Sequence, residues 1–458
     1  MHKDYGCVVR SPNDLNFVRE NGLCVACGAC SAVDEAVSVA LRKSGDFFEP
    51  VGDQLGDKVD AADVCPSLGF NFESDGRELI PTDDEASVSS SVGQYRSIHF
   101  AQSTDSHRSF NATSGAVIPE LASAALQTGM VTQVISLIHS GGLEYEAQGI
   151  SRISELSLMP RSVYHAVNFE NAYSVLQGHT GLSAVIALPC QLEGLAKVLA
   201  KRPELRPKVG LTIGLMCAWA YSRQSVEVLE TYSGREITET TSVQHRGGGP
   251  FGKYRVFDSG KELQSYNRRK DIRYLTAFSR DFNLPRCSIC TNHLNYLADV
   301  VVGDSWIPET RFSKSGISLV IARSQRGETI LQETIKAQKI RTTPARPVDV
   351  LHSEGSALTF AHHAYDHQSR VFGSHRVVFP NAAALPDESS LSHVRRRHLR
   401  EFAIRHRKFY LYFFVKWSRD GFKLMRKILR YVWVHKLGQD PRRKSGEAVA
   451  NDQLRDYD

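Results

Sequence analysis

The spacing of nine cysteines restricts the fold of this 458-residue sequence more than any other feature. A first group contains three cysteines separated by two residues each and a fourth that precedes a proline: Cys24, Cys27, Cys30 and Cys65. Two-residue spacers allow three thiolates to face one centre, and a remote Cys-Pro supplies the fourth ligand of a 4Fe-4S cluster. Gly28 permits the tight backbone that points amides at sulfur. Zinc is the alternative, although it prefers two C-x2-C pairs.

A second group combines two single cysteines with a C-x2-C pair: Cys190, Cys217, Cys287 and Cys290. The two single cysteines each follow a short apolar run, at 184–188 and 209–215. If a helix over 192–200 joins these runs by a right-handed crossover, both thiols emerge at the carboxyl edge of a parallel sheet, where α/β proteins place cofactors. Taken singly, a strand-end cysteine fits equally well as a small apolar residue, and a lone C-x2-C as a zinc or redox pair. Together with the first group, they predict a second 4Fe-4S cluster.

Strands and helices are expected to alternate after the N-terminal 70 residues, which show little periodicity and indicate a loop-dominated, ferredoxin-like segment. The expected strands are 131–138, 184–188, 209–215, 298–302 and 318–322, and the expected helices are 114–129 and 192–200. Short, continuous apolar runs are typical of strands buried on both faces. The sequence therefore predicts an α/β fold with some α+β character, in which helices flank a central mixed or parallel sheet.

Three further segments are candidates for contact with a cofactor. Asp304 and Trp306 follow an apolar run at the same predicted edge, where they would lie beside an aromatic cofactor; a helix or turn cap is the alternative for Asp304. Ser114 and Gly115 offer a hydroxyl and amides at a helix N-terminus, which suit a phosphate or flavin edge, although every N-cap has this pattern. The Arg-Gly-Gly-Gly sequence at 246–249 fits close backbone approach or a surface turn.

Four spaced motifs together resemble the coenzyme F420 hydrogenase/dehydrogenase beta-subunit family: Leu188-Pro189-Cys190-Gln191, Ile213-Gly214-Leu215-Met216-Cys217, Cys287-x2-Cys290 and Ala298-Asp299-Val300-Val301-Val302-Gly303-Asp304. The resemblance runs from about residue 20 to about residue 345. The family includes the 7-hydroxymethyl chlorophyll a reductases and proteins of bacterial polysaccharide gene clusters. The resemblance implies an iron–sulfur flavoprotein oxidoreductase, with one or two 4Fe-4S clusters on the eight cysteines and FAD near Ser114 and Gly115.

The sequence departs from the family pattern at two places. It has Ser114-Gly115-Ala116 where the family commonly has Ser-Gly-Gly. It has Arg161-Ser162-Val163-Tyr164 where the family commonly has Gly-Ser-x-Tyr. Both changes fall where the flavin or substrate pocket is expected, so coenzyme F420 as the substrate rests on the family name alone.

Iron–sulfur clusters carry single electrons, whereas hydride donors and acceptors exchange two. A flavin between them can exchange electrons singly with the clusters and in pairs with the substrate. The resemblance therefore implies electron transfer between an external partner, such as a ferredoxin-like donor or a redox subunit, and a small substrate. The proton donor is unassigned, with His107, His139 and His165 as candidates. The alternatives are a non-catalytic electron-transfer subunit of a larger redox complex and a zinc-stabilised binding protein.

The C-terminal region differs from the rest in charge. Residues 391–444 contain 17 Lys and Arg but three Asp and Glu, while the whole chain carries a net charge of +6. Basic and aromatic residues are interleaved at helical spacing over 395–436, as in a helix on an anionic membrane surface; packing on the body is the alternative. No recognised fold accompanies this charge, so specific nucleic-acid binding is not expected. Without a long apolar run or a signal core, we expect a cytoplasmic protein, peripheral at the inner membrane face.

These interpretations divide the chain into six segments. They are a ferredoxin-like 4Fe-4S segment (1–75), a flavin-side domain (94–175), a domain with the second cluster (176–345), a linker region (346–390), a basic amphipathic helix (391–440) and a disordered tail (441–458). The polar, acidic stretch 71–93 is expected to link the first two.

Overall fold

The computed structural model describes residues 13–378, apart from 82, 90–91, 235, 250–251, 308–309, 311–312, 314, 373 and 375. All of these residues belong to one compact unit, which ends at Val394. The expected basic helix (391–440) and disordered tail (441–458) lie outside the described residues. Within the described part of the chain, no helix combines the length and the apolar character needed to cross a membrane.

An eight-stranded mixed sheet forms the centre of the unit, in the order β16-β6-β15-β14-β10-β9-β7-β8. Its strands are β6 (Ser97–Ser103), β7 (Gln133–Gly141), β8 (Glu144–Ile150), β9 (Ser183–Ala187), β10 (Val209–Leu215), β14 (Val300–Asp304), β15 (Ser318–Ala322) and β16 (Ile340–Pro344). The inner strands β7, β9, β10 and β14 run parallel, and the strands outside them pair antiparallel. The predicted α/β fold with a mixed sheet is confirmed.

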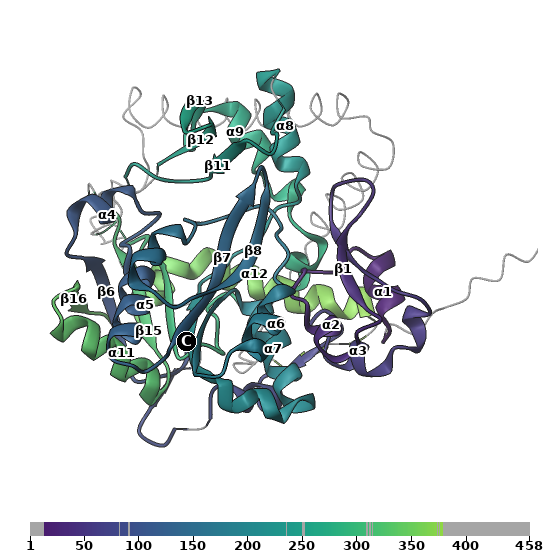
Figure 1. The fold of residues 1–458 in the computed structure, drawn as a ribbon, viewed down its shortest axis with the longest axis horizontal. Coiled ribbons are helices and arrows are strands. Elements are labelled where there is room, and N and C mark those ends of the chain that lie inside the picture. Colours follow the sequence, from purple (N-terminus) through teal and green to yellow (C-terminus); the bar gives the residue numbers. More distant parts are fainter. Residues whose placement is uncertain are drawn as a thin grey trace, which may run out of the picture. The chain divides into compact units, whose positions relative to one another are not determined.

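Helices cover both faces of this sheet (Figure 1). Helices α5 (Val117–Gln127) and α11 (Gln325–Lys336) pack on one face, and α6 (Asn171–Gly178) and α7 (Pro189–Lys201) on the other. Successive side chains of a strand point to opposite faces. In β9, Ala184 and Ile186 join the apolar core with α5 and α11, whereas Val185 and Ala187 join the core with α6 and α7. Continuous burial on both faces explains why the inner strands are short apolar runs.

The predicted elements are close to the observed ones, with one instructive error. The runs 209–215 and 318–322 coincide with β10 and β15, and the helix expected from residue 192 begins at Pro189, a residue type favoured in the first helical turn. The helix expected to be capped by Ser114 begins instead at Val117, with Ala116 at the N-cap. Ser114 does not cap the helix, because its hydroxyl forms a hydrogen bond with Ser318 of β15 instead.

The cysteine-rich N-terminal segment contains little regular structure, as expected. It consists of helices α1 (Leu15–Glu20), α2 (Ala29–Val33) and α3 (Val59–Asp63) with a hairpin of β1 (Ser38–Leu41) and β2 (Phe48–Val51). This segment lies beside α6 and α7 on one face of the sheet (Figure 1). Its cysteine motif therefore adjoins the domain that carries the second group.

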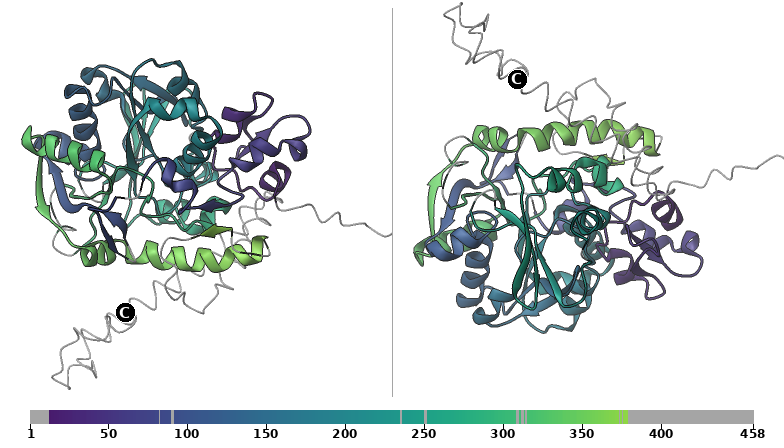
Figure 2. Two further views of the ribbon diagram at one scale, coloured as in Figure 1. Left: turned by 90° about the horizontal axis from the view of Figure 1, so that it is seen from below. Right: turned by 90° about the horizontal axis from the view of Figure 1, so that it is seen from above.

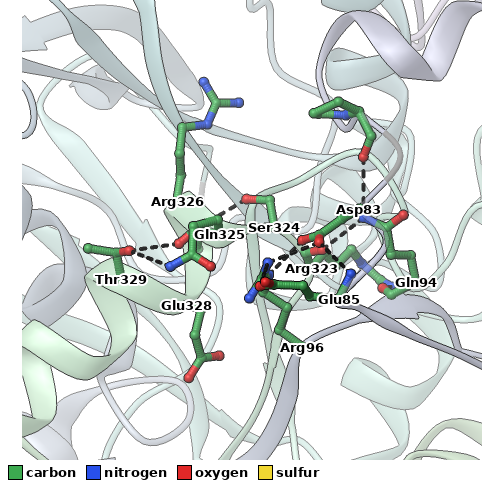
Figure 3. A network of polar contacts seen from close by, with 12 residues as sticks. Asp83, Glu85, Gln94, Arg96, Arg323, Ser324, Gln325, Arg326, Glu328 and Thr329 are labelled. Atoms are coloured by element: carbon green, nitrogen blue, oxygen red, sulfur yellow. Dashed lines mark hydrogen bonds and ion pairs between the residues drawn. The ribbon is translucent and has the colours of Figure 1, made fainter.

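The acidic stretch expected as a linker is fixed to the sheet by a polar network (Figure 3). Its elements are β3 (Phe70–Asn71), β4 (Ser87–Ser89) and β5 (Gly93–Tyr95). Arg96 Nε lies 2.6 Å from Asp83 Oδ2, and Arg96 Nη2 lies 2.9 Å from Glu85 Oε2. Gln94 Nε2 donates to the Arg323 carbonyl over 3.1 Å. The stretch is therefore docked at the junction of β15 and α11.

The remaining elements include a small antiparallel sheet with flanking helices. They are α4 (Ser106–Asn111), α8 (Gln224–Ser233), β11 (Thr241–Gln244), β12 (Lys253–Asp258), β13 (Lys261–Asn267), α9 (Ile272–Ala277), the 3-10 helix η6 (Pro285–Ile289), α12 (Pro347–Phe372) and β17 (Val377–Val378). The structure differs from the expected linker over 346–390, because residues 347–372 form the long helix α12 (Figure 2). Proline occupies its first position, where no amide donor is needed, so this proline starts a helix rather than marking a turn.

Candidate functional site

The four cysteines of the first group line one small enclosed cavity of about 20 Å³. Three of them occupy the loop before α2 and its first turn, and Cys65 follows α3. Gly28 has φ +76°, and a Cβ there would lie 2.3 Å from the Cα of Glu170. Only glycine fits this position, because the conformation is left-handed and the neighbour is backbone. The loop thus closes tightly enough to turn its thiols toward one centre.

Backbone amides point at the sulfurs of the first group. The Ala26 amide donates to Cys24 Sγ over 3.4 Å. Burial raises the pKa of the Cys27, Cys30 and Cys65 thiols, and a nearby backbone amide opposes this rise at each of them. Amide donors at sulfur are a common feature of iron–sulfur sites, where they tune the reduction potential.

The second group gathers at the carboxyl edge of the sheet, as the crossover argument predicted. Strands β9 and β10 are parallel neighbours, so Cys190 and Cys217 leave the sheet at the same edge. Cys287 lies in η6 and Cys290 directly after it. The Ala220 amide donates to Cys287 Sγ over 3.4 Å. Burial raises the pKa of Cys190 and Cys217 well above the usual value, and the Cys287 and Cys290 thiols raise both further.

Two buried polar atoms beside the cysteines have no hydrogen-bond partner among the described residues. They are the hydroxyl of Tyr173 and Nε2 of His293. The Tyr173 pKa is raised by burial and also by Cys27, Cys30 and Cys190. Nδ1 of His293 lies 2.8 Å from the Cys217 carbonyl oxygen. Buried polar atoms are normally paired, so both atoms are available to a group bound at the cysteines.

The same carboxyl edge of the sheet also holds Asp304 and Ser114, two other predicted site residues. The Met216 amide donates to Val302 O over 3.0 Å, which joins the end of β10 to β14. Asp304 ends β14 opposite Ser318 of β15. The Ser318 hydroxyl in turn donates to the Ser114 hydroxyl over 3.1 Å. The structure therefore brings the second cysteine group, Asp304 and Ser114 to one edge of the sheet.

Ser114 and Gly115 use their polar groups within the protein. The Ser114 hydroxyl donates to Ile317 O over 3.0 Å, and the Gly115 amide donates to Ser318 Oγ over 2.9 Å. A Cβ on Gly115 would lie 2.4 Å from the Ala101 carbonyl oxygen. The hydroxyl and amide that were predicted to face a flavin thus hold the start of α5 against β15 and β6.

Asp304 and Trp306 share a cationic partner. Arg246 forms an ion pair with Asp304, and its guanidinium carbon lies 5.2 Å from the centre of the Trp306 ring. Arg246 begins the glycine segment 246–249, whose last amide donates to Phe110 O over 2.9 Å. The segment therefore approaches other backbone closely.

Glu354 is a site residue that the sequence interpretation missed. The Ser353 hydroxyl lies 3.2 Å from Asp304 O and 3.1 Å from Glu354 Oε1, so it joins the carboxyl group to the sheet edge. Burial, and then the charge of Asp304, raise the pKa of Glu354 to about 7. Because Glu354 lies in α12, within the region expected as a linker, no nearby motif pointed to it.

The three histidine candidates have other surroundings. His165 is buried, with Nδ1 2.8 Å from His245 Nε2, and burial lowers its pKa to about 4. His139 Nε2 lies 3.1 Å from Gly142 O. His107 is exposed on α4. His165 is thus an internally bonded core residue rather than a proton donor at neutral pH.

Comparisons with known proteins agree with this arrangement. Residues 182–348 match the family model for the C terminus of the beta subunit of coenzyme F420 hydrogenase/dehydrogenase. The F subunit of the F(420)H(2) dehydrogenase of Methanosarcina mazei is 20% identical over 319 residues, which are 69% of this chain and 84% of the relative. The beta subunit of the coenzyme F420 hydrogenase of Methanothermobacter thermautotrophicus is 24% identical over 274 residues, 56% of this chain and 87% of the relative.

A chain from the F420-reducing NiFe hydrogenase complex of Methanosarcina barkeri aligns with a TM-score of 0.49 and 17% identity, over 65% of this chain and 100% of that chain. The region matched by the family model contains all four cysteines of the second group and Asp304, whereas the first group and nearly all of α12 lie outside it. Residues 182–348 are therefore similar to the C-terminal part of the coenzyme F420 hydrogenase/dehydrogenase beta subunit, and the chain is an oxidoreductase.

Proposed function

We propose that this redox protein is an iron–sulfur flavoprotein with two 4Fe-4S clusters, one on each cysteine group, and FAD at the carboxyl edge of the sheet. The observation that carries the proposal is the gathering of eight cysteines into two buried or partly buried groups, with amides directed at sulfurs in both. Buried thiols with raised pKa values cannot hold negative charge alone, whereas iron shares the charge of a bound thiolate.

The cysteine spacing favours a cluster over zinc for the first group. Zinc sites typically use two C-x2-C pairs, whereas this group has three cysteines at two-residue spacing and a remote Cys-Pro. The sulfides of a cluster would also offer partners for the Tyr173 hydroxyl and the His293 nitrogen.

For the flavin, Asp304, Arg246 and Trp306 offer a charged and aromatic surface next to the second group. An open cavity of about 750 Å³, between β6, β16 and the start of α12, has the size of an organic-cofactor site and includes Ile317, the acceptor of the Ser114 bond. When bound, a flavin supplies the exchange between one-electron and two-electron carriers. Ser114 and Gly115 would support this site through β15 rather than by direct donation.

In this proposal electrons would pass from the first cysteine group to the second, and from the second to the flavin at the carboxyl edge of the sheet. Buried apolar packing from α6 and α7 excludes water from the cysteines, and Arg246 holds Asp304 in place. A ferredoxin-like donor or a redox partner subunit would meet the first group. Coenzyme F420, the substrate named in the relatives, is the first substrate to test. Cytoplasmic location, membrane contact through 395–436 and a link to polysaccharide synthesis stay predictions.

A second candidate function is that of an electron-transfer subunit without its own substrate chemistry. Both of these relatives are named as subunits. This alternative predicts that the purified chain accepts electrons from dithionite but turns over no substrate alone. A large partner that co-purifies and restores turnover would favour it.

The deciding experiment is the visible spectrum of anaerobically purified protein, with iron, sulfide and flavin quantified. We expect about eight irons and roughly one FAD per chain. About four irons per chain together with flavin would show that only one of the two cysteine groups binds a cluster. A colourless protein that contains zinc would overturn the redox proposal.

A further inference from the structure

A buried arginine joins the two cysteine groups directly. Arg286 precedes Cys287 of the second group, and its Nη2 donates to the Pro66 carbonyl oxygen, beside Cys65 of the first group, over 3.2 Å. The same nitrogen lies 3.2 Å from Glu193 Oε2. The exposed fractions of the Arg286 and Glu193 side chains are only 4% and 2%. A cation and an anion thus lie between the two groups, out of contact with water.

The anion belongs to a helix that passes both groups. Glu193 follows the first turn of α7, three residues after Cys190, and its Oε1 accepts from Asn292 Nδ2 over 2.9 Å. At the next position, a Cβ on Gly194 would lie 3.1 Å from Cys27 Sγ. An α-helix rises about 1.5 Å per residue, so roughly 6 Å of helix separates Cys190 from Gly194. Helix α7 therefore carries Cys190 of the second group and packs against Cys27 of the first group within about one turn.

A third side chain occupies the same interval. The Tyr173 hydroxyl lies 3.3 Å from the Cβ position of Gly194, and it has no hydrogen-bond partner among the described residues. Thiols of both groups act on it electrostatically. The space between the groups is thus filled by polar side chains, where an apolar core would pack at no cost in desolvation.

Stability does not explain the ion pair. Replacing a buried ion pair by apolar residues of similar volume is often neutral or stabilising, so such pairs are weak evidence for a structural role. The two charges have opposite effects on their neighbours instead. Arg286 directly precedes Cys287 and reaches the Pro66 carbonyl oxygen next to Cys65, whereas Glu193 stands three residues after Cys190 and next to Gly194, which faces Cys27 Sγ.

We infer that Arg286 and Glu193 are fixed charges that set the reduction potentials of the two proposed clusters, with Arg286 raising and Glu193 lowering them. Reduction adds one negative charge to a cluster, and a nearby cation stabilises that charge in a low-dielectric interior. Arg286 acts most strongly on the second group, since it directly precedes Cys287. It thereby favours electron flow from the first cluster to the second. The inference rests on the proposed function, because it requires both clusters.

The test is a redox titration of the anaerobic holoprotein, followed by electron paramagnetic resonance. Arg286→Gln should lower the potential of the second cluster, and the isosteric Glu193→Gln should raise it. We expect at least a tenfold change in the ratio of reduced to oxidised cluster at a fixed potential, which is about 59 mV for a one-electron centre. The double variant should return toward the wild-type value. The signal that is absent in Cys217→Ser identifies the second cluster.

The exposed ion pair Arg206–Glu78 provides matched controls, since these side chains are 49% and 23% exposed. Arg206→Gln and Glu78→Gln change the same charges and should leave both potentials unaltered. Shifts of the same sign in Arg286→Gln and Glu193→Gln would indicate loosened packing and would overturn the inference. Full iron content without any shift would overturn it while the proposed function stands. Wild-type protein without iron would overturn both, so iron is counted first.

Discussion

The two cysteine groups are supported by very different structures. The first is held by a loop and three short helices, and three of its members lie within seven residues. The second is held by the ends of β9 and β10 and by η6, and its cysteines span residues 190–290 of the chain. A cluster on the first group would fasten one small segment to α7. A cluster on the second would cross-link elements of the main core, so its loss should lower the free energy of unfolding of the whole unit.

The largest effect should come from removing one ligand of each group and comparing the results. Cys30→Ser and Cys217→Ser should each lose about four irons. Because metal binding contributes directly to folding free energy, and the second group ties the central sheet to η6, Cys217→Ser should lose on the order of 5 kcal/mol and Cys30→Ser clearly less. Iron analysis and anaerobic thermal unfolding measure both. Equal losses of stability would show that the groups are equivalent supports.

A smaller effect should come from the helix between the groups. Gly194→Ala places a methyl 3.1 Å from both Cys27 Sγ and the Ala29 Cβ, and we expect it to destabilise the protein by about 2 kcal/mol through overpacking. The matched control is Gly355→Ala in the middle of α12, where a Cβ meets nothing within 4 Å. The control should be stabilised by up to about 1 kcal/mol, because alanine has the higher helix propensity. Urea unfolding of both variants tests this difference.

The contrast between the groups also explains which parts were predictable. The first group could be identified from spacing alone, because its ligands are neighbours in the chain. The second required the sheet topology, which the apolar runs at 184–188 and 209–215 revealed because strands buried on both faces are apolar throughout. Helix α12 is not predicted because the prolines of its region indicate turns, although proline in a first helical turn is compatible with a helix.

The residues between and around the groups carried weaker signals. Glu193 stands three positions after Cys190, on the same face of a helix that the sequence did predict, and Arg286 directly precedes the C-x2-C pair. Both could have been identified as neighbours of a cluster by this spacing. Nothing in the sequence, however, brings Pro66 to Arg286, because that contact depends on how the N-terminal segment packs against α7. Glu354 was hidden for the same reason.

The edge that holds the second group should also respond to pH through Glu354. Its pKa of about 7 lies above the usual value of 4.5, so the folded state binds its proton more tightly than the unfolded state. Below about pH 4.5 the carboxyl is protonated in both the folded and the unfolded state, and its contribution to stability is complete. That contribution is lost as the pH rises through 7, because the buried carboxyl must then give up its proton. Glu354→Gln should therefore unfold at the same temperature as wild type at pH 4.5 and at a higher temperature at pH 8. The difference at pH 8 should be on the order of 3 kcal/mol.

Scanning calorimetry across this pH range measures the Glu354 effect. The Asp304 charge and the Ser353 hydroxyl act on this carboxyl, so Asp304→Asn should bring its titration to lower pH by removing a like charge. A stability difference between wild type and Glu354→Gln that does not change with pH would contradict the assignment.

The smallest effect concerns the start of α5, next to Ser114 and Gly115. Ala116 has φ +59°, a left-handed conformation that costs an alanine about 1 kcal/mol, and it occupies the position where family members commonly have glycine. Ala116→Gly relieves this strain but increases the entropy of the unfolded chain, so the net gain should be about 0.5 kcal/mol. In contrast, Ala124→Gly in the same helix should destabilise by about 1 kcal/mol. If both variants are destabilised, the left-handed start of α5 is not strained, and the departure from the family pattern carries no cost at this edge.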